Sequence, residues 1–242
     1  MPPRAHRLIV LCSAMGTLTV SACGRMDVQP IQVALGCPLQ PLRGADTMAD
    51  EPADRLVDDF EDGDGWLAKE GNRDGNWVEG DDRTSPMVSW ENSQRCAVRG
   101  TRAGHFSAAG LTSWGANLTG LFKKATVAMA TPYDGTGYGG LSFWGAIGTG
   151  GPASLDVPVG VTIMETAWNS SGTYEAMNNC MDFHRAMVTL TPDWRRIDVR
   201  FANLKQQGFG PPAAFQVTQM VGFILWPTNT FDVWLDDVRL EP

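Results

Sequence analysis

Two clusters of carboxylates, near the two ends of the folded region, are the residues of this chain best suited to bind a cation. One runs from Asp58 to Asp64 and the other from Asp232 to Asp237. Carboxylates flanked by large apolar residues are costly to bury without a partner. Calcium takes about six to eight oxygen ligands and would resolve this cost. We therefore expect a calcium site, with the first and last strands lying side by side so that the two clusters meet. The alternative is a solvated acidic end that binds nothing.

Aromatic residues outside the core could provide a second kind of chemistry, the stacking of flat rings on sugars. The segment 168–174 is the most suggestive, since it is a polar stretch with one ring at each end. Tryptophans more often pack in cores, and Trp144, Trp194 and Trp234 are expected to do so. The candidate sugar-binding residues are Trp168, Tyr174, Trp114, Tyr138, Trp90 and Trp77.

Catalytic motifs are absent from the sequence. There is no Gly-x-Ser-x-Gly elbow, phosphate loop or His-Glu-x-x-His helix. Glycoside hydrolysis needs a pair of carboxylates, and no spacing singles out such a pair. Cys180 and His184 lack the further ligands that a zinc site needs. We therefore expect no catalytic residue.

The N-terminal segment predicts export. Arg4 and Arg7 precede an apolar run over residues 8–20, which is too short to cross a bilayer and is typical of a signal peptide over residues 1–22. Val20-Ser21-Ala22-Cys23 resembles a bacterial lipobox, in which Cys23 is lipidated. The alternative is ordinary cleavage after Ala22. A lipidated Cys23 would anchor the protein to the outer membrane or cell surface, or within the periplasm.

Composition narrows the class of partner. The formal net charge is −8, and an acidic chain repels phosphate backbones, which argues against nucleic acid as a ligand. Metal cations and neutral ligands suit it better. The 27 glycines and 15 prolines indicate many turns and short strands rather than long helices.

Three cysteines remain in the chain after Cys23. These are Cys37, Cys96 and Cys180, and an exported protein can form one disulfide among them. We expect Cys96 to pair with Cys180, because both lie in the predicted domain and Cys37 does not. The alternative is that all three are free thiols.

The elements that must position these residues are short strands. Residues 23–54 contain several prolines and no periodicity, which predicts a flexible tether, and the domain is expected over 55–242. Short apolar runs alternate with turn residues, which indicates two packed antiparallel sheets, a jelly-roll β-sandwich. The predicted strands span residues 56–60, 76–78, 87–90, 97–99, 106–108, 140–146, 159–164, 186–189, 195–200, 220–226 and 231–240.

Two of these strands carry expectations about their faces. Alternation in 140–146 sends Leu141 and Phe143 to one face and Trp144 to the other. The strand 231–240 is apolar on both faces, which predicts that it is covered on both sides or that its register shifts at a bulge. Residues 202–207 could form one short helical turn.

Four motifs, in order, carry a family resemblance. They are Leu56-Val57-Asp58-Asp59-Phe60-Glu61-Asp62-Gly63, Pro132-Tyr133-Asp134 with Tyr138-Gly139-Gly140-Leu141-Ser142-Phe143-Trp144, Leu190-Thr191-Pro192-Asp193-Trp194, and Phe231-Asp232-Val233-Trp234-Leu235-Asp236-Asp237-Val238. Together they resemble jelly-roll carbohydrate-binding modules, nearest to family 11 and to related domains of bacterial surface lipoproteins.

The resemblance implies three further features of the domain. These are a galactose-binding-like sandwich, a concave face for a glucan chain, and a structural calcium. By position the calcium ligands are Glu61 and Asp237, followed by Asp59 and Asp236. Family 11 modules use tyrosines on the cleft, and this chain departs from them in having only three tyrosines.

These observations predict an exported lipoprotein whose domain binds a polysaccharide, such as a β-glucan, without catalysis. The alternative is a structural or adhesion module of the cell envelope, whose concave face would lack a row of exposed aromatic residues. A glycan-active hydrolase is a third interpretation. It requires two carboxylates facing each other across a cleft at about 5–9 Å.

Overall fold

The computed structural model describes residues 36–40, 52–124, 130–167 and 182–242. All of them belong to one compact unit, residues 33–242. The strands are β1 (Leu56–Asp58), β2 (Trp77–Asp81), β3 (Val88–Ser93), β4 (Ala103–Ala108), β5 (Ala116–Leu121), β6 (Gly140–Ile147), β7 (Leu155–Ile163), β8 (His184–Leu190), β9 (Arg195–Arg200), β10 (Met220–Leu225) and β11 (Phe231–Glu241). The only helices in the described residues are single 3-10 turns, η1 (Ala53–Arg55), η2 (Glu70–Asn72), η4 (Phe201–Asn203) and η5 (Val217–Gln219), so none there could span a membrane.

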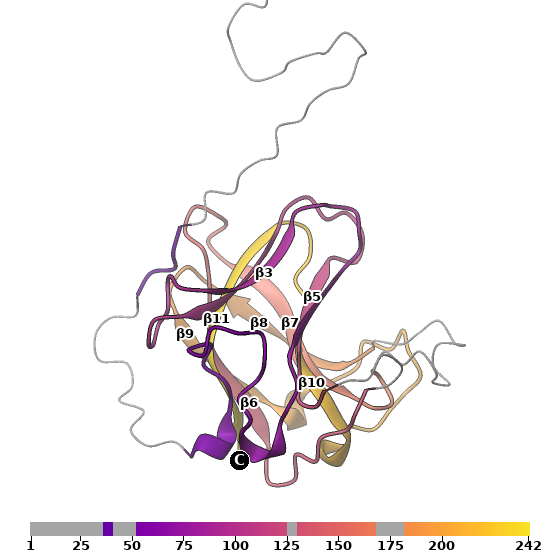
Figure 1. Ribbon diagram of the computed structural model, residues 1–242. Helices are drawn as coiled ribbons and strands as arrows, with labels where there is room; N and C mark the ends of the chain where they lie inside the picture. Colours follow the sequence, from indigo (N-terminus) through magenta and orange to yellow (C-terminus); the bar gives the residue numbers. More distant parts are fainter. Residues whose placement is uncertain (1–35, 41–51, 125–129, 168–181) are drawn as a thin grey trace, which may run out of the picture. The chain divides into compact units, whose positions relative to one another are not determined.

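The strands form two antiparallel sheets, as the sequence predicts. The first sheet has the order β3-β4-β11-β6-β9, with β1 also paired to β11, and the second has the order β2-β5-β10-β7-β8. In Figure 1, β3 and β11 lie on the left and β5 and β10 on the right. The eight strands β4 to β11 follow the double Greek-key order of a jelly roll. The predicted fold class is therefore confirmed.

Alternation along the strands builds a core between the sheets. Leu141 and Phe143 of β6 belong to this core, whereas Trp144 faces outward, as predicted. The core continues through β10 and β11, with Phe223 and Leu235 among its fully buried members. These inward faces are apolar because each strand contributes every second residue to the space between the sheets.

Strand β11 shows both features that its sequence predicts. It is covered on both faces, since Val233 and Leu235 belong to the core and Trp234 belongs to a cluster on the opposite face. Within the sheet it pairs with β4 and β1 along one edge and with β6 along the other. Its register with β6 shifts between Asp236 and Arg239, and Asp237 has a φ of 50°. A bulge at this point turns the acidic residues away from the regular ladder.

A second cluster covers the outer face of the first sheet. It contains Ala103, Trp144, Ala146, Trp194 and Trp234, and the partly buried residues 96–98 pack against it. The three tryptophans are therefore packing residues, as predicted. The loop between β3 and β4 closes this side of the sandwich.

The predicted disulfide is wrong, because Cys96 pairs with Cys37. Cys37 lies in residues 36–40, which the sequence places in the tether. This segment bridges to the sandwich at Thr149 and Asp193, and Leu39 exchanges hydrogen bonds with Pro192 and Trp194. Backbone pairing thus brings Cys37 beside the β3–β4 loop, where it can reach Cys96. Cys180 lies outside the described residues.

Candidate functional site

The fold brings the two carboxylate clusters together. Strand β1 pairs with β11, and Asp58 lies opposite Val238. Glu61 follows β1 and Asp237 lies in the bulge of β11. The expected neighbourhood of the first and last strands is confirmed, and both clusters meet the loop that joins β3 to β4.

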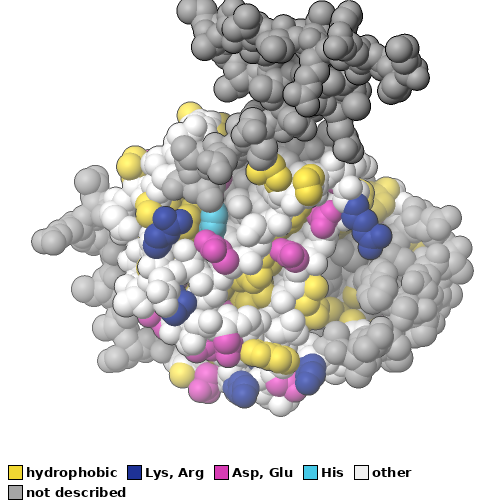
Figure 2. Space-filling model, turned by 45° about the horizontal axis from the view of Figure 1, so that its top comes forward, with side chains coloured by type: hydrophobic (Ala, Val, Ile, Leu, Met, Phe, Trp, Pro, Cys, Tyr) yellow, Lys and Arg dark blue, Asp and Glu magenta, His cyan; other side chains and the backbone are white. Residues whose placement is uncertain are grey.

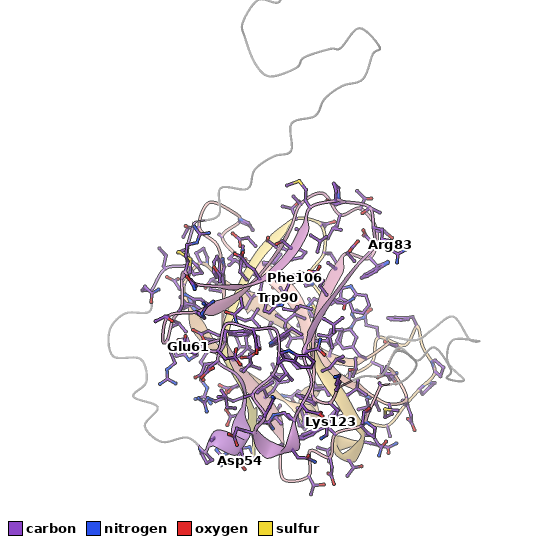
Figure 3. The ribbon with its side chains drawn as sticks, viewed as in Figure 1. Asp54, Glu61, Arg83, Trp90, Phe106 and Lys123 are labelled. Atoms are coloured by element: carbon purple, nitrogen blue, oxygen red, sulfur yellow. A yellow bond between two sulfur atoms is a disulfide. The ribbon has the colours of Figure 1, made fainter. Side chains whose placement is uncertain are left out.

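The predicted calcium ligands have hydrogen-bond partners of their own. Glu61, labelled in Figure 3, accepts the backbone N–H groups of Thr101 and Arg102, each at 2.8 Å. The Asp237 carboxylate pairs with the guanidinium groups of Arg99 and Arg239 at 2.9 and 2.6 Å. These donors satisfy the two carboxylates that the resemblance ranks first.

Asp236 and Asp59 complete the predicted set. Asp236 Oδ2 accepts the N–H groups of Val98 and Arg99, while its buried Oδ1 has no hydrogen-bond partner. Asp59 Oδ1 accepts the N–H of Glu61 at 3.2 Å. In the described part of the chain, no group of three or more His, Cys, Asp or Glu residues is arranged to hold a metal ion. Calcium at this end stays a prediction.

Burial controls the protonation of two carboxyls at this end. It raises the pKa of Asp58 to about 7, although Trp77 and Phe60 donate hydrogen bonds to the carboxylate. It raises the pKa of Asp236 to about 8. Burial also acts to raise the pKa of Glu61, but the hydrogen bonds from residues 101 and 102 outweigh it and lower the pKa.

Of the predicted sugar-binding residues, Trp77 is buried, so the prediction that it lies off the core is wrong. It is 5% exposed and belongs to the core, since it enters β2 on the inward face and packs on Phe60 and Phe223. Trp90 is half-buried, lies opposite Phe106 of β4 and packs edge-on against Phe60 (Figure 3).

The other predicted sugar-binding residues have different positions. Tyr138 is half-buried, packs against the core and donates to the Asp54 carbonyl at 3.3 Å. Trp168 and Tyr174 lie outside the described residues. Trp114 is 43% exposed.

Exposed hydrophobic side chains gather on the outer face of the second sheet. Figure 2 shows one side of the molecule, on which several hydrophobic side chains group near the middle with acidic side chains beside them. Six large hydrophobic side chains are exposed among the described residues, and all except Leu39 lie on or beside that outer face. The five on or beside this face are Trp66, Val78, Trp114, Met187 and Phe209.

Strand alternation explains why these side chains face outward. Val78 and Met187 follow the inward-facing Trp77 and Ala186, so each points away from the core. Trp66 pairs with Asn76, the residue before Trp77, and therefore shares the outward side.

Four rings and one cation on this face form a continuous run that we call the aromatic row, made of Trp114, Trp226, Phe183, Arg185 and Phe209. Trp226 stands at 5.3 Å from Trp114 in an edge-on arrangement and stacks on Phe183 at 5.5 Å. The Arg185 guanidinium lies 5.1 Å from the Phe183 ring and 6.0 Å from the Phe209 ring. Trp226 follows the core residue Leu225 and Arg185 precedes the core-facing Ala186, so both point outward.

A carboxylate holds the loop that carries Trp114. Asp82 Oδ2 accepts the N–H groups of Ser113 and Gly115 at 2.9 and 3.0 Å. Trp226 Nε1 donates to the Trp114 carbonyl at 2.8 Å. The Trp114 ring is thus presented to solvent from a backbone fixed at both flanks and at its own carbonyl.

A second carboxylate holds the loop that carries Phe209 in the same way. Asp182 is buried and accepts the N–H groups of Gln207, Gly208 and Gly210 at 2.8 to 3.0 Å. Phe209, between the last two donors, is 47% exposed. Both exposed rings of the aromatic row therefore stand on anchored loops, which limits the entropy lost when a ligand orders them.

A polar cluster around His105 on the first sheet makes contacts within the protein that hold strands together. His105 stacks on Trp234 at 4.0 Å, and its Nε2 and Nδ1 face Asp232 Oδ1 and Glu91 Oε1 at 2.7 and 3.2 Å. Both ring nitrogens are occupied by carboxylates, so the ring offers none to a substrate. The cluster ties β3, β4 and β11 together.

Sequence reasoning missed most of the aromatic row. Trp226 ends an all-apolar strand, which gives no sign of the face that its last residue takes. Asp182 and Phe183 come before the strand predicted over 186–189, and Phe209 lies in a Gly-Pro turn segment, so no alternation assigns them to a face. The one usable signal was the alternation of β8, which places Arg185 and Met187 outward.

Comparisons with known proteins give matches among solved structures alone. No protein-family model and no curated protein matches the chain. A family 11 carbohydrate-binding module of the cellulase Lic26A-Cel5E of Clostridium thermocellum is 13% identical, with a TM-score of 0.48 over 77% of this chain and 93% of that one.

Two further solved structures are similar at the same level. The Clostridium thermocellum family 11 module in complex with a β-1,3-1,4-mixed-linked tetrasaccharide is 13% identical, with a TM-score of 0.49 over 77% of this chain and 94% of that one. The xylan-binding CBM22-1 domain of Paenibacillus barcinonensis Xyn10C is 12% identical, with a TM-score of 0.39 over 68% and 84%. At these values the case for a ligand rests on the geometry of this chain.

Proposed function

We propose that the domain binds a polysaccharide without catalysis, on the outer face of the second sheet. The observation that carries this proposal is the aromatic row, in which Trp114 and Phe209 are exposed at fixed positions on either side of Trp226. An exposed aromatic ring can cover the apolar C–H face of a sugar ring, and two such rings on one face suit a chain of sugar units. Phe183 is fully buried and Trp226 is half-buried, so these two rings support the exposed ones.

The two outer faces of the sandwich differ in a way that favours this location. On the first sheet the outward tryptophans Trp144, Trp194 and Trp234 are buried under the β3–β4 loop. On the second sheet, outward aromatic residues remain exposed. An exposed apolar patch of this kind marks an interaction site. The two exposed rings, Trp114 and Phe209, support the carbohydrate over the structural or adhesion alternative.

Affinity electrophoresis tests the proposal. The purified protein is run through gels containing mixed-linkage β-1,3-1,4-glucan, xylan or an acidic polysaccharide, and its retardation is compared with gels lacking polymer. Trp114→Ala and Phe209→Ala should each weaken binding by about fivefold or more, if the loss of one stacking ring costs about 1–3 kcal/mol, as it does for bases stacked on aromatic side chains.

Leu39→Ala is the matched control, because Leu39 is 52% exposed but lies away from the second sheet. It should bind as the unchanged protein does. Equal binding by all three variants would refute the location of the site. Absence of binding to every polymer by a folded protein would refute carbohydrate recognition and leave the adhesion alternative.

We also propose that the protein is exported and anchored through lipidated Cys23. The disulfide between Cys37 and Cys96 supports export, since such bonds persist in oxidising compartments. Metabolic labelling with a fatty acid should mark the unchanged protein and leave Cys23→Ala unlabelled. Label in both would contradict the proposed site of lipidation.

A further inference from the structure

The aromatic row contains a cation whose hydrogen-bonding capacity is unused. Arg185 is half-buried between Phe183 and Phe209. Its Nε and Nη2 are buried and have no hydrogen-bond partner. A buried unsatisfied donor is costly, and a charged one more so. The guanidinium is held by the rings without any oxygen to receive its protons.

The nearest carboxylate does not supply that oxygen. Burial lowers the pKa of Arg185, and the charge of Asp182 acts in the opposite direction. The Asp182 oxygens, however, accept the backbone N–H groups of Gln207, Gly208 and Gly210. Asp182 therefore lowers the cost of the charge on Arg185 but leaves the guanidinium donors free.

A second cation stands beside the first. Lys205 and Arg185 exchange two backbone hydrogen bonds of 3.0 Å, so they form an antiparallel pair whose side chains share a face. Lys205 is exposed, and neither side chain has an ion pair with any residue that the structure describes. In a chain of net charge −8, two adjacent cations on the ring-bearing face that form no direct ion pair with a described residue are distinctive.

We propose, building on the carbohydrate-binding function above, that the polysaccharide carries an acidic group that pairs with Arg185 and Lys205. The carboxylate of a uronic acid has two oxygens in one plane, and a sulfate ester has several terminal oxygens. Either group can accept two hydrogen bonds from one guanidinium. Trp114 and Phe209 would stack on the sugar rings while the two cations select for charge. Hydroxyl groups of a neutral glycan would leave the half-buried guanidinium of Arg185 without an ion pair.

The test compares charged and uncharged forms of polymers that share the same sugar backbone. Polygalacturonate is compared with its methyl-esterified form, and dextran sulfate with dextran, in affinity gels at about 0.15 M ionic strength. Mixed-linkage β-glucan is the further neutral probe. We expect retardation by one acidic polymer of these two pairs and little by its neutral form. The pair that responds distinguishes a carboxylate from a sulfate.

Variants then locate the effect. Arg185→Gln and Lys205→Gln should each weaken binding to the acidic polymer, by about tenfold for the guanidinium. Arg195→Gln is the matched control, since its side chain is 62% exposed on β9 of the first sheet. Lys205 is exposed, so Lys205→Gln decides the result if Arg185→Gln fails to fold, as judged by its melting curve.

Each outcome separates this inference from the proposed function. Binding to neutral polymers with Arg185→Gln and Lys205→Gln unchanged would overturn the acidic ligand and keep carbohydrate binding. Loss of acidic-polymer binding by Arg195→Gln to the same degree would show diffuse attraction and overturn the role of the two cations. No retardation by any polymer would overturn both proposals.

Discussion

Removing the disulfide between Cys37 and Cys96 should destabilise the domain strongly. The two cysteines are separated by 59 residues, and closing a loop of that length stabilises the folded state by about 4 kcal/mol in the chain-entropy description. For a domain of this size, about 2–4 °C of melting temperature corresponds to each kcal/mol. The double variant Cys37→Ser, Cys96→Ser should therefore melt about 8–16 °C lower.

Urea unfolding followed by tryptophan fluorescence is a suitable assay, because Trp194 and Trp234 lie beneath the loop that carries Cys96. Cys180→Ser is the control and should unfold at the same urea concentration as the unchanged protein. Destabilisation by Cys180→Ser, together with an unaltered Cys37→Ser variant, would refute the pairing and the anchoring of residues 36–40.

Three further predictions concern carboxylates. Burial raises the pKa of Asp58 from 3.8 to about 7, so the folded state binds this proton more tightly than the unfolded state does, and the free energy of unfolding should fall as pH rises from about 4 to 7. Asp58→Asn should flatten that slope in urea titrations with chelator present. An unchanged slope would contradict the shift. Desolvation acts to raise the pKa of Asp82, but its hydrogen bonds hold the pKa at about 2, so the stabilisation it gives is present above pH 3.8 and should be lost as pH falls through about 2. Asp82→Ala should also free the Trp114 loop and weaken glycan binding, whereas unaltered affinity would show that the anchor is dispensable. If calcium binds at Glu61 and Asp237, millimolar calcium should raise the melting temperature and Glu61→Gln should abolish that rise, whereas equal melting with calcium and with chelator would argue against the site.

The sequence predicted those parts of the fold that depend on alternation. Leu141, Phe143 and Trp144 divide between two faces as expected, because successive side chains of a strand must point to opposite sides. The burial of β11 on both faces could be read from its apolar residues, and its bulge was an alternative left open. The neighbourhood of the two carboxylate clusters followed from the topology.

Contacts between segments without periodicity could not be predicted in the same way. Cys37 lies among prolines and glycines, and only its bridges to Thr149 and Asp193 bring it to Cys96. Trp77 was expected at the surface because its strand pattern spanned three residues, too few to define a face. The aromatic row combines an interstrand loop, a strand end and a Gly-Pro turn, so no single stretch of sequence contains it.

The central claim is that the outer face of the second sheet binds a glycan through Trp114 and Phe209. The most direct measurement is calorimetric titration of the folded protein with an oligosaccharide of whichever polymer retards it, alongside Trp114→Ala and Leu39→Ala. The account predicts binding by the unchanged protein and by Leu39→Ala, with a loss of about fivefold or more in Trp114→Ala. Undiminished binding by Trp114→Ala and by Phe209→Ala would contradict it and move the site elsewhere on the sandwich.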